Sequence, residues 1–270
     1  MDLIQVFQNT RMISGAEYAK ETNRSIQDLI LYDDPYDEID DVFEVTEGDM
    51  KIRWVHGGTV STAYELAESC ERVAMLDFAD AKKPGGWVEE GAPTQEENMC
   101  RCTNLYEALI SPEAKPYFTV NNQFGDVTHF VESYTDSMLY VPNVAIFKDD
   151  SMYERIPTRF VDVIVSPAPC GYTEDSFATM DYRIAGFLKA AYKQGATDLV
   201  LGAWGCGAFG QPPEVTGEAF ASALKDYRIF KSVTFAIRET VKTRWVDPTF
   251  ELFKKAFETT YYAEDEDGEE

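Results

Sequence analysis

The sequence is poor in the residues that usually hold metal ions and disulfide bridges. It contains only two histidines, His56 and His129, among 270 residues. Its five cysteines are scattered and form no C-x-x-C pair: Cys70, Cys100, Cys102, Cys170 and Cys206. This usage argues against a cysteine/histidine zinc site and against a disulfide scaffold. We expect a protein that holds no metal and works in a reducing, cytoplasmic compartment.

Basic residues are also scarce. Lysine and arginine number 24 against 48 aspartates and glutamates, which gives a formal net charge of -24. That balance argues against a basic surface that follows a nucleic-acid backbone or an anionic membrane, so neither partner is expected. Much of the acidic charge lies in two runs, Asp33–Glu47 and Glu264–Glu270. The second run has no apolar residue to bury and is expected to be a disordered tail.

Long apolar runs, targeting signals and linkers are missing as well. No stretch reaches the ~18 apolar residues of a membrane span, and residues 1–5 do not resemble a signal peptide. No repeat and no Gly/Ser- or Pro-rich linker divides the chain. With 44% hydrophobic and 13% aromatic residues, the sequence predicts one packed domain, and we expect a monomer.

What the sequence does contain is an alternation of short apolar runs with amphipathic stretches. The predicted strands are 73–79, 161–165, 198–204 and 232–237, and the predicted helices are 60–67, 95–110, 177–191, 214–227 and a last one through Phe250 and Phe257. This alternation predicts helices on both faces of a largely parallel sheet. Ligands of such sheets bind at the carboxyl ends of the strands.

The first candidate site is a glycine turn that follows the strand 73–79. It reads Pro84-Gly85-Gly86-Trp87 and runs into Gln95-Glu96-Glu97 at the start of a helix for which Thr94 is the expected N-cap. Glycines let the backbone approach a ligand, and carboxylates perform acid/base chemistry. Glu97 has a second interpretation, because Thr94-x-x-Glu97 also matches a capping box in which the glutamate serves only the helix.

The second candidate site is the loop Gly205-Cys206-Gly207-Ala208-Phe209-Gly210, between a predicted strand and a predicted helix. Backbone N–H groups of such a loop form an anion nest that binds diphosphate without lysine. The G-x-G-x-x-G spacing is also that of dinucleotide-binding dehydrogenases. That alternative fits poorly, because the loop lies late in the chain and the first acid after the next strand is Glu239, nearly thirty residues beyond Gly210. A turn that serves only packing is the third possibility.

Taken with further motifs, the two loops resemble the bacterial-type poly(ADP-ribose) glycohydrolases, a branch of the macrodomain fold. Besides the glycine turn, the Gln-Glu-Glu triplet and the glycine loop, the matching segments are Arg11 with Glu21-Thr22, Tyr134–Asp136, Val141–Asp150 and Ser166-Pro167-Ala168-Pro169. The resemblance implies a three-layer α/β/α macrodomain with a mixed, largely parallel sheet and an N-terminal helical extension. We expect the extension at 1–50, the catalytic core at 51–260 and the acidic tail at 261–270.

The resemblance also implies an activity and a set of site residues. The expected activity is hydrolysis of O-glycosidic bonds in poly- or mono-ADP-ribose, with ADP-ribose or an ADP-ribosylated protein as partner and no metal or other cofactor. Glu97 matches the catalytic acid/base, and Glu96 matches a residue that orients the sugar. The matching substrate-binding positions are Asp77, Gly85, Gly86, Trp87, Gln95, Pro167, Ala168, Gly205, Cys206, Gly207, Ala208, Phe209 and Gly210. Among them, Phe209 is expected against a ribose.

Helix geometry predicts unequal roles for the two glutamates. Consecutive helical residues point about 100° apart, so Glu96 and Glu97 are not expected to flank one bond as the paired carboxylates of ordinary glycosidases do. A single glutamate, Glu97, would then give a proton to the leaving oxygen and take one from water. The alternative function is a macrodomain that binds ADP-ribose, or a related NAD-derived signal, without turnover.

The chain departs from the family pattern at two positions. Trp87 stands where the family has a third glycine, and Asp77 stands where it has an asparagine near the distal ribose. Trp87 either turns into the core or narrows the cleft. The second possibility, together with the acidic surface, favours a terminal or single ADP-ribose over internal polymer bonds as the substrate.

Overall fold

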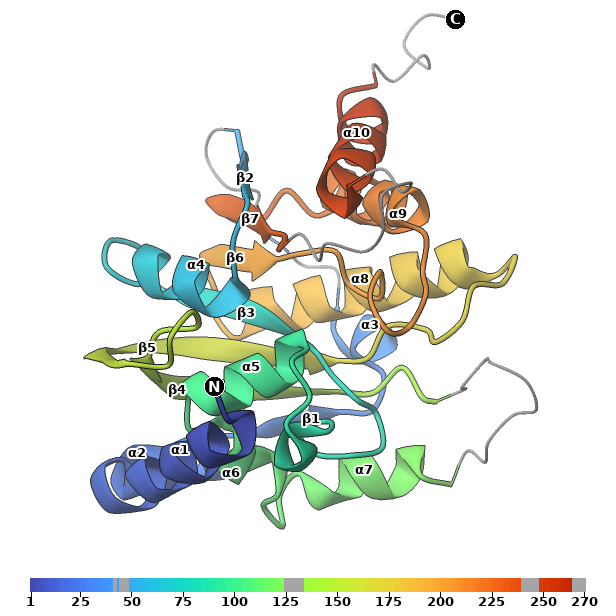
Figure 1. Ribbon diagram of the computed structural model, residues 1–270. Helices are drawn as coiled ribbons and strands as arrows, with labels where there is room; N and C mark the ends of the chain where they lie inside the picture. The colour runs from blue at the N-terminus through green and yellow to red at the C-terminus, as the bar shows by residue number, and fades with distance from the viewer. Residues whose placement is uncertain (41–42, 44–48, 124–133, 239–247, 264–270) are drawn as a thin grey trace, which may run out of the picture.

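A computed structural model of the chain describes residues 1–40, 43, 49–123, 134–238 and 248–263. Within these ranges the strands form one sheet in the order β1-β4-β5-β3-β6-β7-β2 (Figure 1). Strands β5, β3, β6, β7 and β2 are parallel, whereas β4 and β1 are antiparallel to their neighbours. The strand bounds are Ile30–Tyr32 (β1), Lys51–Val55 (β2), Val73–Phe78 (β3), Met138–Lys148 (β4), Arg155–Ser166 (β5), Asp198–Leu201 (β6) and Ser232–Ala236 (β7). The predicted mixed, largely parallel sheet is confirmed.

Helices cover both faces of the sheet, and each face has its own apolar cluster. One face packs against α3 (Pro35–Glu38), α8 (Ser176–Lys193), α9 (Pro213–Asp226) and α10 (Thr249–Tyr261). The other packs against α1 (Leu3–Glu17), α2 (Ala19–Gln27), α4 (Thr59–Leu66), α5 (Gln95–Cys102), α6 (Leu105–Leu109) and α7 (Lys115–Asn121). The helices on both faces that the alternation predicts are confirmed, and with the sheet they form the three-layer α/β/α architecture that the resemblance implies.

Strand β3 shows why the sequences of the central strands are continuous runs of apolar residues. Its successive side chains alternate between the faces: Leu76 packs in the cluster with α8 to α10, and Met75 packs in the cluster with α5. Both faces are dry, so both sets of side chains are apolar. Asp77, which lies on the same face as Met75, is the exception, and its side chain is fully buried.

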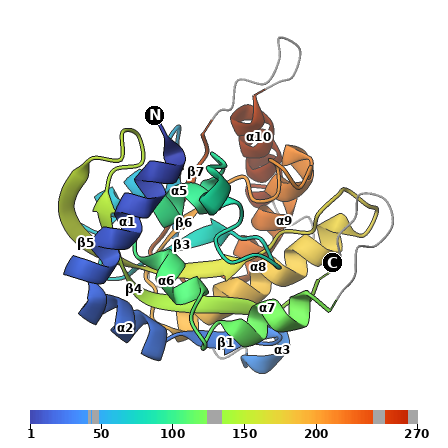
Figure 2. The ribbon, with the colours of Figure 1, turned by 60° about the horizontal axis from the view of Figure 1, so that its bottom comes forward.

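The N-terminal helices α1 and α2 lie beside α5 and α6 (Figure 2). The Thr10 hydroxyl donates to the Arg101 carbonyl at 2.5 Å, and Arg11 pairs with Glu107 on α6 at 2.8 Å. The first fifty residues also supply strand β1 at the edge of the sheet, which the expected helical extension did not include. That strand has only three residues, too few for an alternating pattern to be recognised.

Two predicted elements end several residues earlier than expected. The predicted helix 95–110 is two helices, because Thr103 takes an extended conformation and forms a bridge to Ile146 of β4. The predicted strand 198–204 ends at Leu201, and the fully buried Trp204 instead donates its indole N–H to the Ser166 carbonyl at 2.9 Å. The acidic tail, His129 and Glu239 lie outside the described residues. Among the helices of the described ranges, none is apolar over a length that would cross a membrane.

Candidate active site

The two glycine segments leave neighbouring strands at the same edge of the sheet. Strands β3 and β6 are parallel, hydrogen-bonded neighbours, so the turn after Phe78 and the loop after Leu201 begin side by side. A Cβ atom placed on Gly202 would lie 3.0 Å from Phe78 Cζ. Both glycine segments therefore lie at the carboxyl ends of neighbouring parallel strands, where such sheets bind their ligands.

The glycine turn folds over the first turn of α5. Gly85 and Gly86 have φ of 69° and 58°, in the left-handed region that favours glycine. A Cβ on Gly86 would lie 2.5 Å from Glu97 Oε1 and 2.9 Å from Glu96 Oε2. Both carboxylates therefore reach the same glycine. The unequal roles that helix geometry predicts for the two glutamates stay a prediction.

Glu97 is held by two donors. The backbone N–H of Trp87 donates to its Oε1 at 2.9 Å, and the hydroxyl of Thr94 donates to its Oε2. Thr94 is the N-cap of α5, as predicted, but its side chain makes no cap hydrogen bond to the backbone. The capping-box interpretation of Glu97 is therefore wrong: the carboxylate bonds the Thr94 hydroxyl and the glycine turn. Glu97 is only 4% exposed, so it lies in a largely dry setting.

Glu96 and Asp77 are also buried beside Glu97. Glu96 Oε2 accepts from the Asp80 N–H at 2.8 Å, while its Oε1 has no partner in the described part of the chain. Burial, and then the charge of Asp77, raises the pKa of Glu96 well above its ordinary value. Asp77 is 0% exposed, and burial followed by the charge of Glu97 raises its pKa in the same way. Asp77 therefore lies beneath the glutamates rather than on an open surface.

Gln95 is fully engaged with the protein. Its amide nitrogen donates to the Leu76 carbonyl at 2.8 Å and to the Thr59 hydroxyl at 3.1 Å, and its oxygen accepts from the Phe78 N–H at 2.9 Å. These bonds fix the start of α5 to the end of β3 and to α4. In this arrangement Gln95 positions the elements that carry the site.

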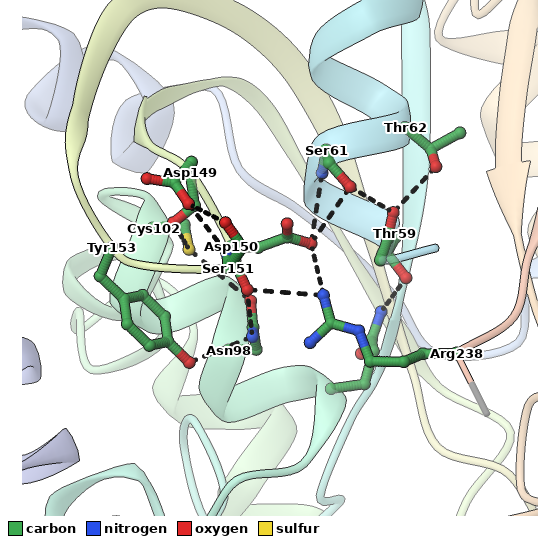
Figure 3. Close-up of polar contacts among 12 residues, drawn as sticks. Thr59, Ser61, Thr62, Asn98, Cys102, Asp149, Asp150, Ser151, Tyr153 and Arg238 are labelled. Atoms are coloured by element: carbon green, nitrogen blue, oxygen red, sulfur yellow. Dashed lines mark hydrogen bonds and ion pairs between the residues drawn. The ribbon is translucent and has the colours of Figure 1, made fainter. Parts of the chain in front are cut away.

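A loop after β4 anchors α5 from its other side (Figure 3). Asn98, directly after Glu97, donates to the Tyr153 hydroxyl at 3.2 Å and to the Asp150 carbonyl at 3.4 Å. Asp149 holds the loop by accepting from the N–H groups of Met152 and Glu154, each at 2.7 Å, and from Ser151. Burial raises the pKa of Asp149, but these hydrogen bonds outweigh it and lower the pKa to about 2.

The same loop borders a cavity of about 510 Å³ at the carboxyl ends of β2 and β7. Arg238 donates to Asp150 Oδ2 at 3.2 Å, and the same oxygen accepts from the Ser61 N–H at 3.4 Å (Figure 3). A Cβ on Gly58 would lie 1.8 Å from Asp150 Oδ2, so glycine is needed for this approach. The cavity is lined by His56, Gly57, Gly58, Ser61, Asp149, Asp150, Ser151 and Arg238.

The second glycine loop carries unused donors. Gly205 and Gly210 have φ of 81° and 72°, and the loop closes through the Gln211 N–H, which donates to the Gly205 carbonyl at 3.0 Å. Across the described residues, the N–H groups of Gly207, Ala208 and Phe209 have no backbone partner. Gly207 and Ala208 are exposed. Three successive amides are thus available for an anion.

The segment after β5 lies against this loop. The Phe209 carbonyl accepts from the Gly171 N–H at 2.8 Å, and a Cβ on Gly205 would lie 2.8 Å from the Ala168 Cβ. Ala168 is buried next to Pro167 at the end of β5. The Cys206 thiol turns inward to Thr216 at 3.4 Å, and burial raises its pKa to about 12. The side chain of Cys206 therefore serves packing, and only its backbone is offered to a ligand.

Trp87 points outward from the turn. Its side chain is 57% exposed, and the Lys83 ammonium lies 3.9 Å from the ring centroid. Lys83 also pairs with Glu90 at 2.8 Å. The interpretation of Trp87 as a core residue is wrong, because the buried neighbour in the turn is Val88.

Sequence reasoning missed several residues that support the site. Thr94 was expected to cap a helix and instead bonds Glu97. Asn98, Asp150 and Arg238 were not expected to act together. The sequence pointed to two of them only by their position: Asn98 directly follows Glu97, and Asp150 is the last residue of a segment that matches the family.

Comparison with known proteins identifies the family. The model of the family described as "Microbial-type PARG, catalytic domain" matches residues 5–149, where PARG is poly(ADP-ribose) glycohydrolase. This range includes the glycine turn and both glutamates and ends at Asp149. A search of curated proteins gives no match.

Solved structures extend the likeness over nearly the whole chain. Poly(ADP-ribose) glycohydrolase from Thermomonospora curvata is 25% identical with a TM-score of 0.82, covering 94% of this chain and 99% of that one. The enzyme from Deinococcus radiodurans in complex with ADP-ribose is 29% identical with a TM-score of 0.75, covering 89% and 98%. The T. curvata enzyme bound to the inhibitor ADP-HPD is 26% identical with a TM-score of 0.79, covering 94% and 99%.

Proposed function

Because this chain belongs to the microbial-type poly(ADP-ribose) glycohydrolase family, we propose that it binds ADP-ribose and hydrolyses its O-glycosidic bonds with Glu97 as acid/base. The observation that carries the assignment of Glu97 is its placement. One of its oxygens faces Gly86, at the turn that leaves the carboxyl end of β3, and donors fix the carboxylate from both sides. A group held in this way is ready to act on a bond that lies against the glycine turn.

The reaction needs one group that first gives and then takes a proton. As the bond between the ribose anomeric carbon and the leaving oxygen breaks, its electron pair goes to that oxygen, and the protonated Glu97 supplies the proton. Water then adds to the anomeric carbon and loses a proton to the Glu97 carboxylate. The products are an ADP-ribose with a free anomeric hydroxyl and an alcohol, and Glu97 is protonated again.

The second glycine loop supplies the binding site for the diphosphate. The N–H groups of Gly207, Ala208 and Phe209 can hold its negative charge without lysine. This suits a chain with a net charge of -24, whose surface repels polyanions elsewhere. Gly205 and Gly210 shape the loop, Phe209 lies against a ribose, and Gly85 and Gly86 border the distal sugar.

The preferred substrate is a terminal or single ADP-ribose. The exposed indole of Trp87, held by Lys83, stands at the glycine turn where the family has glycine. A chain that continues past the cleaved bond on this side would have to pass the indole, whereas a terminal unit would not. We also propose that the protein acts as a cytoplasmic monomer, because its cysteine usage fits a reducing compartment and its sequence predicts a single domain.

Calorimetry and turnover separate this function from simple ADP-ribose binding. The enzyme should bind ADP-ribose in the calorimeter and release it from poly(ADP-ribose) or from a mono-ADP-ribosylated protein. Tight binding of ADP-ribose, without its release from either substrate, would instead establish a macrodomain that binds ADP-ribose without turnover. Rapid internal cleavage of long polymer would contradict the proposed preference for terminal units.

A further inference from the structure

Side chains hold the carbonyl groups of the segment 166–171, which begins at the end of β5. The amide of Gln211 donates from Nε2 to the Pro169 carbonyl at 2.7 Å and to the Gly171 carbonyl at 3.1 Å. The three carbonyls before these also accept from side chains: Ser166 from Trp204 at 2.9 Å, Pro167 from Arg183 at 3.0 Å and Ala168 from Tyr134 at 2.7 Å. Gln211 therefore fixes the end of the segment that lies against the second glycine loop.

Gln211 is also built into the base of this loop. It follows Gly210 directly, and its N–H closes the loop by donating to the Gly205 carbonyl at 3.0 Å. A Cβ on Gly205 would lie 2.9 Å from Gln211 Cγ, so the glutamine packs tightly against the loop. Pro212 and Pro213 come next, and proline has no N–H to donate. Gln211 is thus the last residue before α9 that can close the loop through its backbone.

The outer part of the loop has few other contacts apart from the half-buried ring of Phe209. A Cβ on Gly207 or on Gly210 would meet nothing within 4 Å. The Phe209 carbonyl is held from the neighbouring segment by the Gly171 N–H at 2.8 Å. Gln211 holds the carbonyl of that same glycine. The path of the outer loop therefore depends on Gln211 through Gly171.

Gln211 makes these contacts in a dry setting. It is only 2% exposed, and its Oε1 has no hydrogen-bond partner in the described part of the chain. Its Nε2 faces two carbonyl oxygens, which an amide oxygen in its place would repel, so the orientation of the amide is fixed. Without these donors, the two carbonyls would lose hydrogen bonds where little water can replace them, and the segment would have to shift.

We propose that Gln211 is a positioning residue that ties the second glycine loop to the segment 166–171 and so holds the amides of residues 207–209 in place for the diphosphate of ADP-ribose. The inference rests on the proposed function, in which these amides bind the diphosphate. Donors bind an anion best when they already point to one place, because binding then does not have to order the loop. Gln211 supplies this order before the ligand arrives.

Amide hydrogen exchange without ligand tests the tie itself. In Gln211→Met, a side chain of similar length replaces the amide and donates nothing. The Gly171 amide should then exchange at least about tenfold faster than in the wild type, because its acceptor on Phe209 is no longer held against it. The core amide of Val200 in β6 should not follow. Unchanged exchange at Gly171, or equal acceleration at Val200, would overturn the proposal.

Gln194→Met is the matched control. Gln194 also donates from its amide, to the Tyr32 hydroxyl at 2.8 Å, but it is the C-cap of α8 and has no hydrogen bond to the second glycine loop or the segment 166–171 among the described residues. This variant should leave both the exchange at Gly171 and the affinity for ADP-ribose unchanged. A control affected as strongly as Gln211→Met would overturn the proposal.

Calorimetry and steady-state kinetics test the effect on binding. In Gln211→Met, the Kd of ADP-ribose and the KM of the substrate should both rise about 10-fold to 100-fold, with kcat within about threefold of the wild type. The rate of the chemical step should persist because the donors that hold Glu97, Trp87 and Thr94, belong to other segments. An unchanged Kd, or a loss confined to kcat, would overturn the proposal.

Failure of this proposal differs from failure of the proposed function. If the wild type does not bind ADP-ribose, the proposed function fails, whereas exchange at Gly171 still shows whether Gln211 holds the loop. If the wild type binds normally and Gln211→Met binds equally well, only this proposal fails. Should Gln211→Met not fold, Gln211→Asn keeps an amide but withdraws it from the two carbonyls. Its Gly171 exchange and its Kd for ADP-ribose should each rise at least about threefold, and wild-type values would overturn the proposal.

Discussion

The backbone N–H of Trp87 donates a 2.9 Å hydrogen bond to Oε1 of Glu97. This bond joins the glycine turn to the first turn of α5, so the two segments fix each other. It uses only the backbone of residue 87, and any amino acid except proline could make it. Replacing a glycine by tryptophan therefore leaves Glu97 in place and changes only what stands outside the turn.

Trp87→Gly should change substrate preference rather than the chemical step. Removing the indole opens the outer side of the turn. The rate of cleavage at internal bonds of long poly(ADP-ribose) should therefore rise about 10-fold relative to the rate on a mono-ADP-ribosylated protein. One contact in a binding pocket typically changes substrate preference by a factor of this size. Chromatography of the products from both substrates measures this ratio. An unchanged ratio would mean that the indole does not border the path of the polymer.

Gly86→Ala should inactivate the enzyme. The added Cβ would lie 2.5 Å from Glu97 Oε1 at a residue with φ of 58°, so the turn or the carboxylate must move. We expect turnover to fall at least about 100-fold, since a displacement of about 1 Å suffices for such a loss. Stability should fall by about 1–3 kcal/mol.

Gly15→Ala is the matched control for that substitution. Gly15 lies in α1, and a Cβ there meets nothing within 4 Å. This variant should keep full activity and gain about 0.5–1 kcal/mol of stability from helix propensity. Equal activity of the two glycine variants would contradict the close approach at Gly86.

Thr94→Val should lower kcat and leave KM nearly unchanged. Valine keeps the shape of threonine but removes the hydroxyl that bonds Glu97 Oε2. Loss of one hydrogen bond to a group that becomes charged during the reaction should slow turnover about 10-fold. Thr94→Ser retains the hydroxyl and should restore most of the rate. A serine variant as slow as the valine variant would point to packing instead.

Asp149→Asn should destabilise the protein in a pH-dependent way. Hydrogen bonds from the loop 151–154 outweigh burial and lower the pKa of Asp149 to about 2, so its stabilisation is present above the unfolded pKa of about 3.9 and is lost as pH falls through about 2. Because asparagine still accepts some of these bonds, we expect a cost of about 1–2 kcal/mol at pH 7. Urea unfolding should show that the difference in free energy of unfolding between the wild type and Asp149→Asn is smaller at pH 3 than at pH 7. An equal difference at the two pH values would contradict this role of Asp149.

The sequence predicted the elements that carry the site better than the contacts within it. Strand β3, the glycine turn and the Gln-Glu-Glu helix start follow local rules of burial, backbone freedom and capping. The break at Thr103 could not be predicted, because the helical spacing of Met99, Cys102 and Tyr106 continues across it. A bridge to Ile146, distant in sequence, interrupts the helix there.

The convergence of the two glutamates was also beyond the sequence. Helix periodicity does not show that Gly86 lies against both glutamates, yet a Cβ there would lie 2.5 Å from Glu97 Oε1 and 2.9 Å from Glu96 Oε2. In the same way, strand periodicity places Asp77 on one face of β3 but does not say that its oxygens lack a hydrogen-bond partner among the described residues. Those facts depend on tertiary packing, which local patterns do not encode.

Turnover by Glu97→Gln tests the central claim most directly. The amide keeps the size of the side chain but cannot give and take the proton, so kcat for release of ADP-ribose should fall at least about 1,000-fold while calorimetric affinity for ADP-ribose stays within about threefold of the wild type. Glu89→Gln, at an exposed glutamate in the short helical turn before α5, should keep full activity. A Glu97→Gln enzyme that releases ADP-ribose at the rate of Glu89→Gln would contradict the account.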